Sequence, residues 1–125
     1  MKRLLLFAIL FALLSINVKS QFYNIEGLWK STSSYTFKLS YNTNNNDDYV
    51  GLIIKNTRTG DVFYADLKSS TYYVAKEYKS STGSYYTKPY SNYYEYQYKI
   101  HNCFNITVTT YVNSELYSVH KWVKL

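Results

Sequence analysis

Apolar and polar side chains alternate along most of the chain after residue 26. The segment 35–41 shows the pattern plainly, because its odd-numbered positions are aromatic or aliphatic and its even-numbered positions are polar. Such alternation places successive side chains on opposite faces of a β-strand. About eight segments of this kind follow one another: 27–31, 35–41, 49–55, 62–67, 71–78, 93–100, 104–109 and 115–124. The pattern predicts an all-β domain without a helix.

Turn-forming residues separate these segments and indicate how the strands connect. Asn, Asp, Gly, Ser and Thr are concentrated in 42–48, 56–61 and 79–84, which we expect to be exposed loops. Pro89, the only proline, cannot donate to a β-ladder and is not expected in a central strand. Short connections favour antiparallel pairing of strands that are neighbours in sequence. We therefore expect a small antiparallel up-and-down barrel, with a β-sandwich as the alternative.

The last two segments allow a more detailed prediction. If Asn113 and Ser114 form the turn of a hairpin, Val112 pairs with Glu115. This register places the following residues on the face that we assign to the core: Phe104, Ile106, Val108, Tyr117, Val119 and Val123. The opposite face then carries Cys103, Asn105, Thr107, Thr109, Ser118, His120 and Trp122, with Trp122 directly opposite Asn105. A loop with an odd number of residues would exchange the faces of one strand.

Residues 1–20 have the features of a secretory signal peptide. Lys2 and Arg3 precede an unbroken apolar run, 4–14, and Ser20 ends a short polar stretch. We expect cleavage after Ser20, which leaves a single tyrosine-rich domain, 21–125, as a secreted, extracellular protein. An uncleaved membrane anchor is the alternative, but the run is well short of the roughly 20 apolar residues that a span needs. No second apolar run follows, so we expect no membrane attachment after cleavage.

Charge argues against a nucleic-acid partner. Removal of Lys2, Arg3 and Lys19 with the signal leaves 11 basic residues against 8 acidic ones. Arg58 is the only arginine that remains, and the lysines are scattered singly rather than clustered on one face. Nucleic-acid-binding domains normally concentrate their basic residues.

Tyrosine is heavily over-represented, with 17 residues, all of them after residue 20. Tyrosine favours strands, and its ring can be buried while its hydroxyl stays in water. Two explanations remain open at this point. An AT-rich genome would enrich Tyr, Asn, Lys and Ile together, and a stacking surface for sugars or other flat ligands would enrich tyrosine specifically.

The residues Gly27, Leu28 and Trp29, followed by about seven more strands, resemble the start of the calycin barrels: lipocalins, fatty-acid-binding proteins and avidins. In lipocalins this tryptophan closes the floor of the barrel, and a basic residue from late in the chain packs across it. The resemblance implies that Trp29 lies inside the barrel near one end, with Lys121 or Lys124 as the basic residue. The other lipocalin motifs and the C-terminal helix are missing, and the length is closer to that of avidin.

An aromatic ladder is the most unusual feature of the sequence. In a strand, Tyr94, Tyr96 and Tyr98 form one stripe that Ile100 extends. Together with Trp29 and Tyr35, these tyrosines are the candidate ligand-binding residues. The stripe is compatible with a filled core and with the lining of a pocket, since an eight-stranded barrel has room for side chains or for one small ligand.

We expect a non-catalytic binding protein for a small apolar molecule or a carbohydrate. The alternative is an extracellular structural, matrix or self-assembling protein that associates through surface tyrosines. We expect no enzyme and no cofactor, because the sequence contains no strong catalytic or cofactor motif. We also expect no metal site, because His101 and His120 are the only histidines and no ligand cluster accompanies them.

Two further residues are candidates for covalent modification. Asn105-Ile106-Thr107 is an N-glycosylation sequon, and the hairpin register turns Asn105 outward; an unused sequon is the alternative. Cys103 is the only cysteine, so we expect an intermolecular disulfide, as in a homodimer, or a free thiol. Burial as a small apolar side chain is the competing interpretation of Cys103.

Overall fold

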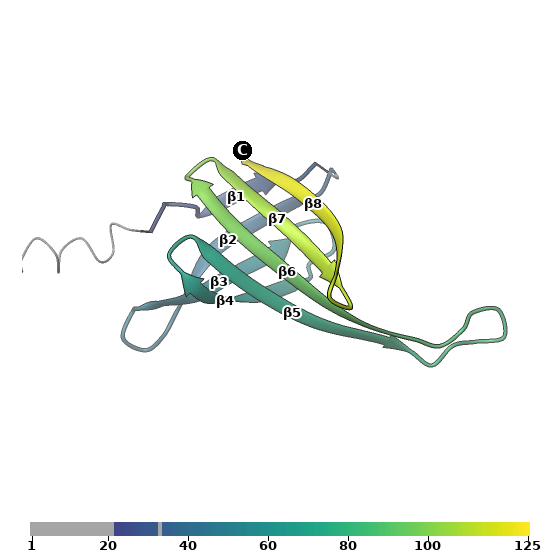
Figure 1. Cartoon of the computed structure of the whole chain (residues 1–125). Coiled ribbons are helices and arrows are strands. Elements are labelled where there is room, and N and C mark those ends of the chain that lie inside the picture. Colours follow the sequence, from purple (N-terminus) through teal and green to yellow (C-terminus); the bar gives the residue numbers. More distant parts are fainter. Residues whose placement is uncertain (1–21, 33) are drawn as a thin grey trace, which may run out of the picture.

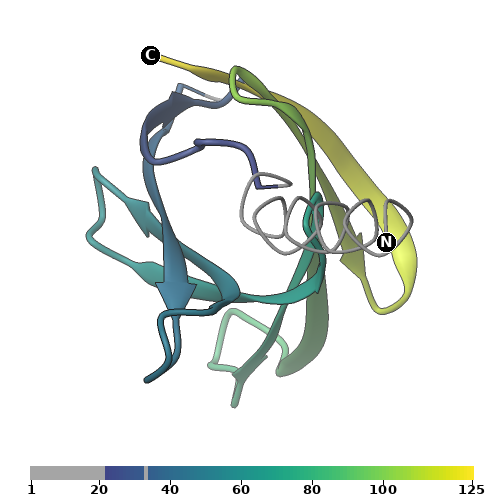
Figure 2. The same cartoon turned by 90° about the vertical axis from the view of Figure 1, so that its left-hand side faces the viewer.

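The chain folds into a closed antiparallel β-barrel. The computed structural model describes residues 22–32 and 34–125, so the predicted signal peptide and its cleavage site lie outside the described residues. The strands are β1 (Gly27–Lys30), β2 (Thr36–Thr43), β3 (Tyr49–Asn56), β4 (Val62–Ser69), β5 (Tyr72–Ser81), β6 (Tyr90–Asn102), β7 (Asn105–Val112) and β8 (Glu115–Lys124). Each strand pairs with the next, and β8 returns to pair with β1, which closes the barrel and excludes the sandwich (Figures 1 and 2). The described part of the chain contains no helix with the length and hydropathy of a bilayer span.

Alternation accounts for most of these strands. On β2 the inward side chains include Leu39 and Tyr41, and on β6 they include Tyr98 and Ile100, as the period of two predicts. The main difference concerns 79–84, which we expected to be a loop. There β5 continues to Ser81 and pairs with the start of β6, so the two strands form a hairpin arm that projects from one end of the barrel (Figure 1).

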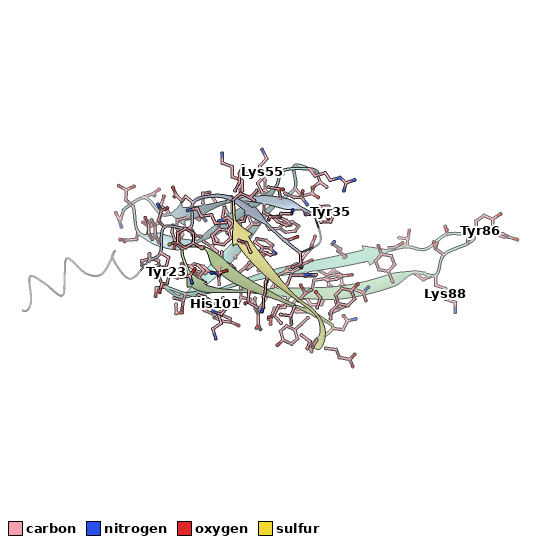
Figure 3. All side chains as sticks on the ribbon, turned by 90° about the horizontal axis from the view of Figure 1, so that it is seen from above. Tyr23, Tyr35, Lys55, Tyr86, Lys88 and His101 are labelled. Atoms are coloured by element: carbon pink, nitrogen blue, oxygen red, sulfur yellow. The ribbon has the colours of Figure 1, made fainter. Side chains whose placement is uncertain are left out.

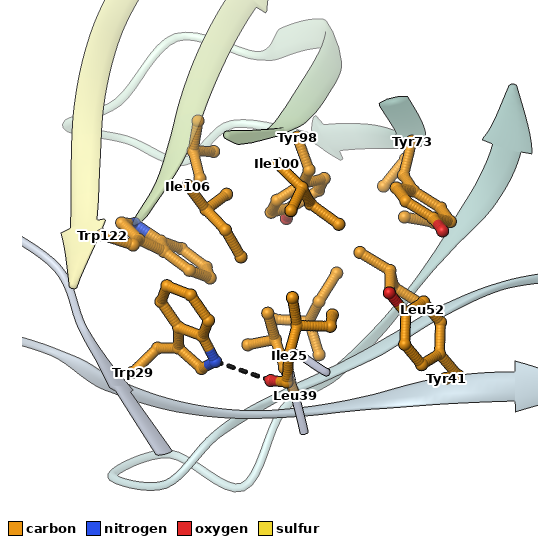
Figure 4. Close-up of a cluster of buried hydrophobic side chains, with 14 residues drawn as sticks. Ile25, Trp29, Leu39, Tyr41, Leu52, Tyr73, Tyr98, Ile100, Ile106 and Trp122 are labelled. Carbon is orange, nitrogen blue, oxygen red and sulfur yellow. Dashed lines mark hydrogen bonds between the residues drawn. The ribbon is translucent and has the colours of Figure 1, made fainter. Parts of the chain in front are cut away.

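Residues 22–26 lie at one end of the barrel, the closed end (Figure 2), and the side chains buried there include Ile25, Trp29 and Leu39 (Figure 4). Trp29 is fully buried, and its Nε1–H donates to the carbonyl oxygen of Ile25 at 2.8 Å. Ile25 is itself fully buried and lies across this closed end. Trp29 therefore lies inside near one end, as expected. Of the two candidate basic residues, Lys124 pairs with Trp29 and its Nζ donates to the carbonyl oxygen of Asn24 at 3.1 Å.

The predicted faces of β8 are wrong, although the predicted turn is right. Val112 pairs with Glu115, but a β-bulge between Thr110 and Tyr111 shifts the register, so that Thr110 pairs with Ser118. The bulge adds one residue to β8, so every β8 side chain beyond it lies on the opposite face of the sheet from the predicted one. Tyr117, Val119 and Val123, predicted to be core, are exposed, and Trp122, predicted to face outward, is buried opposite Ile106 rather than opposite Asn105. Phe104, also predicted to be core, is exposed because it lies in the β6–β7 turn.

Gly51 on β3 allows a close backbone approach that no other residue would permit. A Cβ atom built on Gly51 would lie 2.2 Å from the backbone oxygen of Ala65 on the neighbouring strand β4. Because that atom belongs to the backbone, the two strands would have to move apart. We predict that Gly51→Ala lowers the free energy of unfolding by about 3 kcal/mol, the upper part of the range for overpacking.

Urea denaturation followed by far-UV circular dichroism measures this loss. Gly60→Asn is the matched control, because Gly60 has a φ of 81° and open space around it, and asparagine tolerates such a φ. The control should change stability by less than about 1 kcal/mol. Equal stability of Gly51→Ala and the natural protein would show that β3 and β4 are not this close.

Candidate functional site

A cavity of about 240 Å³ opens at the end of the barrel opposite Ile25. Strands β1, β3, β5 and β7 end there, so the loops after them and the hairpin arm surround its mouth. Residues 22–26 lie at the other end of the barrel (Figure 1). The interior is therefore filled by side chains at one end and accessible from outside at the other.

Aromatic rings form the floor of the cavity. Phe37 and Trp122 stack in parallel with ring centroids 4.3 Å apart, and Tyr98 meets Trp122 edge-to-face at 5.7 Å. Trp122 and Tyr98 are only 5% and 4% exposed. Rings packed this closely hold one another in position, so the floor presents a rigid apolar surface.

Tyr96 and Phe63 form the wall below the hairpin arm. Their ring centroids are 6.1 Å apart, and the Tyr96 hydroxyl donates to Glu77 Oε2 at 3.1 Å. Burial raises the pKa of Tyr96 above its usual value, and the negative charge of Glu77 raises it further. Burial also raises the pKa of Tyr98. Both hydroxyls therefore stay protonated at neutral pH and remain hydrogen-bond donors.

Polar groups occupy the rim rather than the floor. His120 Nδ1 and Thr32 Oγ1 form a hydrogen bond of 2.8 Å, and the guanidinium of Arg58 lies 5.6 Å from the centroid of the Tyr35 ring. Asn56 Oδ1 accepts from the backbone N–H of Arg58 at 2.9 Å, so this side chain holds the β3–β4 turn at the mouth. A mainly aromatic cavity with a few polar groups at its edge is the usual form of a small-molecule site.

Three of the five predicted ligand-binding residues line this cavity: Tyr35, Tyr96 and Tyr98. Tyr94 lies farther out on the arm, where its ring stacks on that of Tyr96 with centroids 6.2 Å apart. Trp29 does not line the cavity, because it is buried at the closed end. The ladder on β6 thus contributes to the core at Ile100 and to the cavity at Tyr96.

Four other aromatic or imidazole side chains of the cavity were not among the predicted ligand-binding residues: Phe37, Phe63, His120 and Trp122. Phe37 shares the face of Tyr35 in the alternating segment 35–41. Alternation on β4 could have indicated Phe63, which shares a face with the buried Ala65. His120 and Trp122 could not be found in this way, because the bulge in the final hairpin decides their side of the sheet.

The two modification candidates lie away from the cavity, at the closed end. Asn105 is exposed at the start of β7, and its Nδ2 donates to Asn102 Oδ1 at 3.1 Å. Cys103 is half-buried in the β6–β7 turn, between the outward and the core positions that we considered. Glycosylation of Asn105 and intermolecular pairing of Cys103 stay predictions. Among residues 22–32 and 34–125, no three His, Cys, Asp or Glu side chains gather as a metal site would need.

Comparisons of the chain with protein-family models, with curated proteins and with solved structures find no match. The resemblance to calycins, which concerns Gly27, Leu28 and Trp29, stays a prediction, because many unrelated barrels share this overall shape.

Proposed function

We propose that this chain is a secreted, non-catalytic binding domain whose cavity takes a small, flat, apolar molecule. The observation that carries the proposal is the aromatic cavity of about 240 Å³ at the accessible end of the barrel. The signal-like features of residues 1–20 support secretion.

The size and lining of the cavity indicate the class of ligand. An apolar cavity of about 150 Å³ holds benzene, so this larger cavity suits a molecule of one or two fused rings. Phe37 and Trp122 offer flat faces for stacking, and His120 at the rim offers a hydrogen bond to one polar substituent. A carbohydrate is less favoured in this cavity, because each of its hydroxyl groups needs a polar partner.

Titration calorimetry with 1-naphthol tests the proposal. Thr110 points into the cavity from β7, whereas its neighbour Thr109 has the opposite orientation on the same strand. We predict that Thr110→Phe weakens 1-naphthol binding at least about tenfold, because the added ring occupies the ligand's volume. Thr109→Phe is the matched control and should bind like the natural protein.

Two outcomes would contradict the proposal. Equal binding of 1-naphthol to both variants would place the ligand outside the cavity. Binding of N-acetylglucosamine in place of 1-naphthol would favour the carbohydrate alternative. Circular dichroism of each variant checks that the barrel is intact.

A further inference from the structure

The hairpin arm leaves one strand edge open. Backbone pairing between β4 and β5 is confined to the region from Val74 back to Tyr72, whereas β5 pairs with β6 as far as Ser81. Within the part of the chain that the structure describes, no strand pairs with the β4-facing edge of residues 75–81. The arm carries this edge away from the barrel, as the positions of Tyr86 and Lys88 near its tip show (Figure 3).

Hydrogen-bond parity identifies the groups that this edge presents. Ile100 N donates to the Thr71 carbonyl at 2.8 Å, so the odd-numbered residues of β5 bond to β6. In an antiparallel ladder the N–H and C=O of one residue point to the same side, and successive residues alternate. Lys76, Tyr78 and Ser80 therefore direct their N–H and C=O groups to the open edge. Unpaired edges of this kind are templates for another strand.

We propose that the open edge of β5 pairs with the same edge of a second copy of this chain. In the two-fold antiparallel arrangement centred on Tyr78, this residue faces Tyr78 of the second copy, and Lys76 faces Ser80. All three residues that direct backbone groups to the edge then form hydrogen-bonded pairs. An edge that pairs with itself in this way gives a closed dimer.

Charge complementarity supports a second copy as the partner. In the arrangement centred on Tyr78, Glu77 of each chain lies directly opposite Lys79 of the other. Opposite charges at facing positions stabilise a ladder, and like charges destabilise it. Tyr78 is 67% exposed, and its hydroxyl forms a hydrogen bond with Ser91 Oγ on β6, away from the open edge. Within one chain, Lys79 Nζ already lies 3.7 Å from Glu77 Oε2, so pairing would join four alternating charges.

The same charges exclude the neighbouring registers. Only shifts by two residues preserve both the hydrogen-bond parity and the face of each side chain. One such shift places Glu77 opposite Glu77, and the other places Lys79 opposite Lys79. Pairing also has to end near Ser80, because the next edge-facing residue, Thr82, would lie opposite Val74, whose edge β4 occupies. The register centred on Tyr78 is therefore the one that both charge and geometry favour.

Charge-swap variants test the proposal by sedimentation equilibrium. The protein is produced from the full precursor and kept under reducing conditions, so that Cys103 cannot link two copies. We expect a reversible dimer for the natural protein. Glu77→Lys and Lys79→Glu should each raise the dimer dissociation constant at least about tenfold, because each creates two like-charge pairs across the two-fold axis.

An equimolar mixture of the two variants provides the decisive control. In the mixed dimer both pairs formed by positions 77 and 79 have opposite charges, so the mixture should dimerise more tightly than either variant alone. Tyr78→Pro removes an edge-facing N–H that takes no part in β5–β6 pairing, and it should abolish the dimer while the barrel's circular dichroism is retained. A monomeric natural protein, single variants that dimerise normally, or a mixture that stays monomeric would each overturn the proposal. So would pairing of the edge only with an extended segment of a different protein.

Discussion

The barrel is expected to unfold steeply as the pH rises above about 10. Tyr41, Tyr73 and Tyr98 are all less than one-tenth exposed, and burial raises the pKa of each phenol, for Tyr73 to about 12. In the unfolded chain these groups titrate near the usual value of 10.0. Below this pH both states are protonated, and the stability is unaffected. Above it only the unfolded state loses the protons, so rising pH favours unfolding.

The size of this effect follows from the number of protons. Each proton that the unfolded state releases and the folded state retains lowers the free energy of unfolding by about 1.4 kcal/mol per pH unit. The three tyrosines together give a slope of about 4 kcal/mol per pH unit. A domain with about 5–8 kcal/mol of stability would therefore unfold within about two pH units above 10.

Parallel titrations by circular dichroism and by phenolate absorbance measure this transition. The buried phenols should ionise together with the loss of strand signal. Tyr98→Phe should lower the slope by about one proton, whereas Tyr85→Phe should leave it unchanged, because Tyr85 is 94% exposed at the tip of the arm. Ionisation of every tyrosine near pH 10, with the barrel still folded, would contradict the burial of these phenols.

Replacement of Trp29 is expected to have the largest effect on stability of any single substitution in the core. Trp29 is 0% exposed, and its indole N–H donates to the Ile25 carbonyl. Trp29→Ala removes the ring that fills the closed end and leaves that carbonyl without its partner (Figure 4). We predict a loss of about 3–5 kcal/mol in the free energy of unfolding, the usual cost of truncating a buried tryptophan.

Urea denaturation followed by circular dichroism measures the loss, and two variants separate its causes. Trp29→Phe keeps an aromatic ring but removes the donor, so it should cost about 1–3 kcal/mol. Leu28→Ala is the matched control on the same strand. Leu28 is exposed, so this change should cost less than about 1 kcal/mol. A loss no larger for Trp29→Ala than for Leu28→Ala would show that the tryptophan does not hold the end of the barrel.

Alternation along the sequence was sufficient to predict the eight strands, apart from the outer part of the β5–β6 hairpin, and several inner faces. The side chains of Leu39, Tyr98 and Ile106 lie inside, as their positions in the alternating segments predict. This information is local, because the pleat of a strand sends successive side chains to opposite faces whatever the partner strand is. The position of Trp29 also followed from the sequence, through the resemblance of its neighbours to calycins. The cavity was predicted only in part, through Tyr35, Tyr96 and Tyr98.

Tertiary structure alone decided the features on which the proposals depend. The bulge beside Tyr111 turns His120 and Trp122 into the cavity, and a single extra residue in a ladder leaves no mark on composition or periodicity. Closure pairs Lys30 with Val123, residues too distant in sequence for any local pattern to relate. The open edge of β5 exists because β4 and β5 separate beyond Val74. Alternation determines which face a side chain takes, but the three-dimensional course of neighbouring strands determines which edges find a partner.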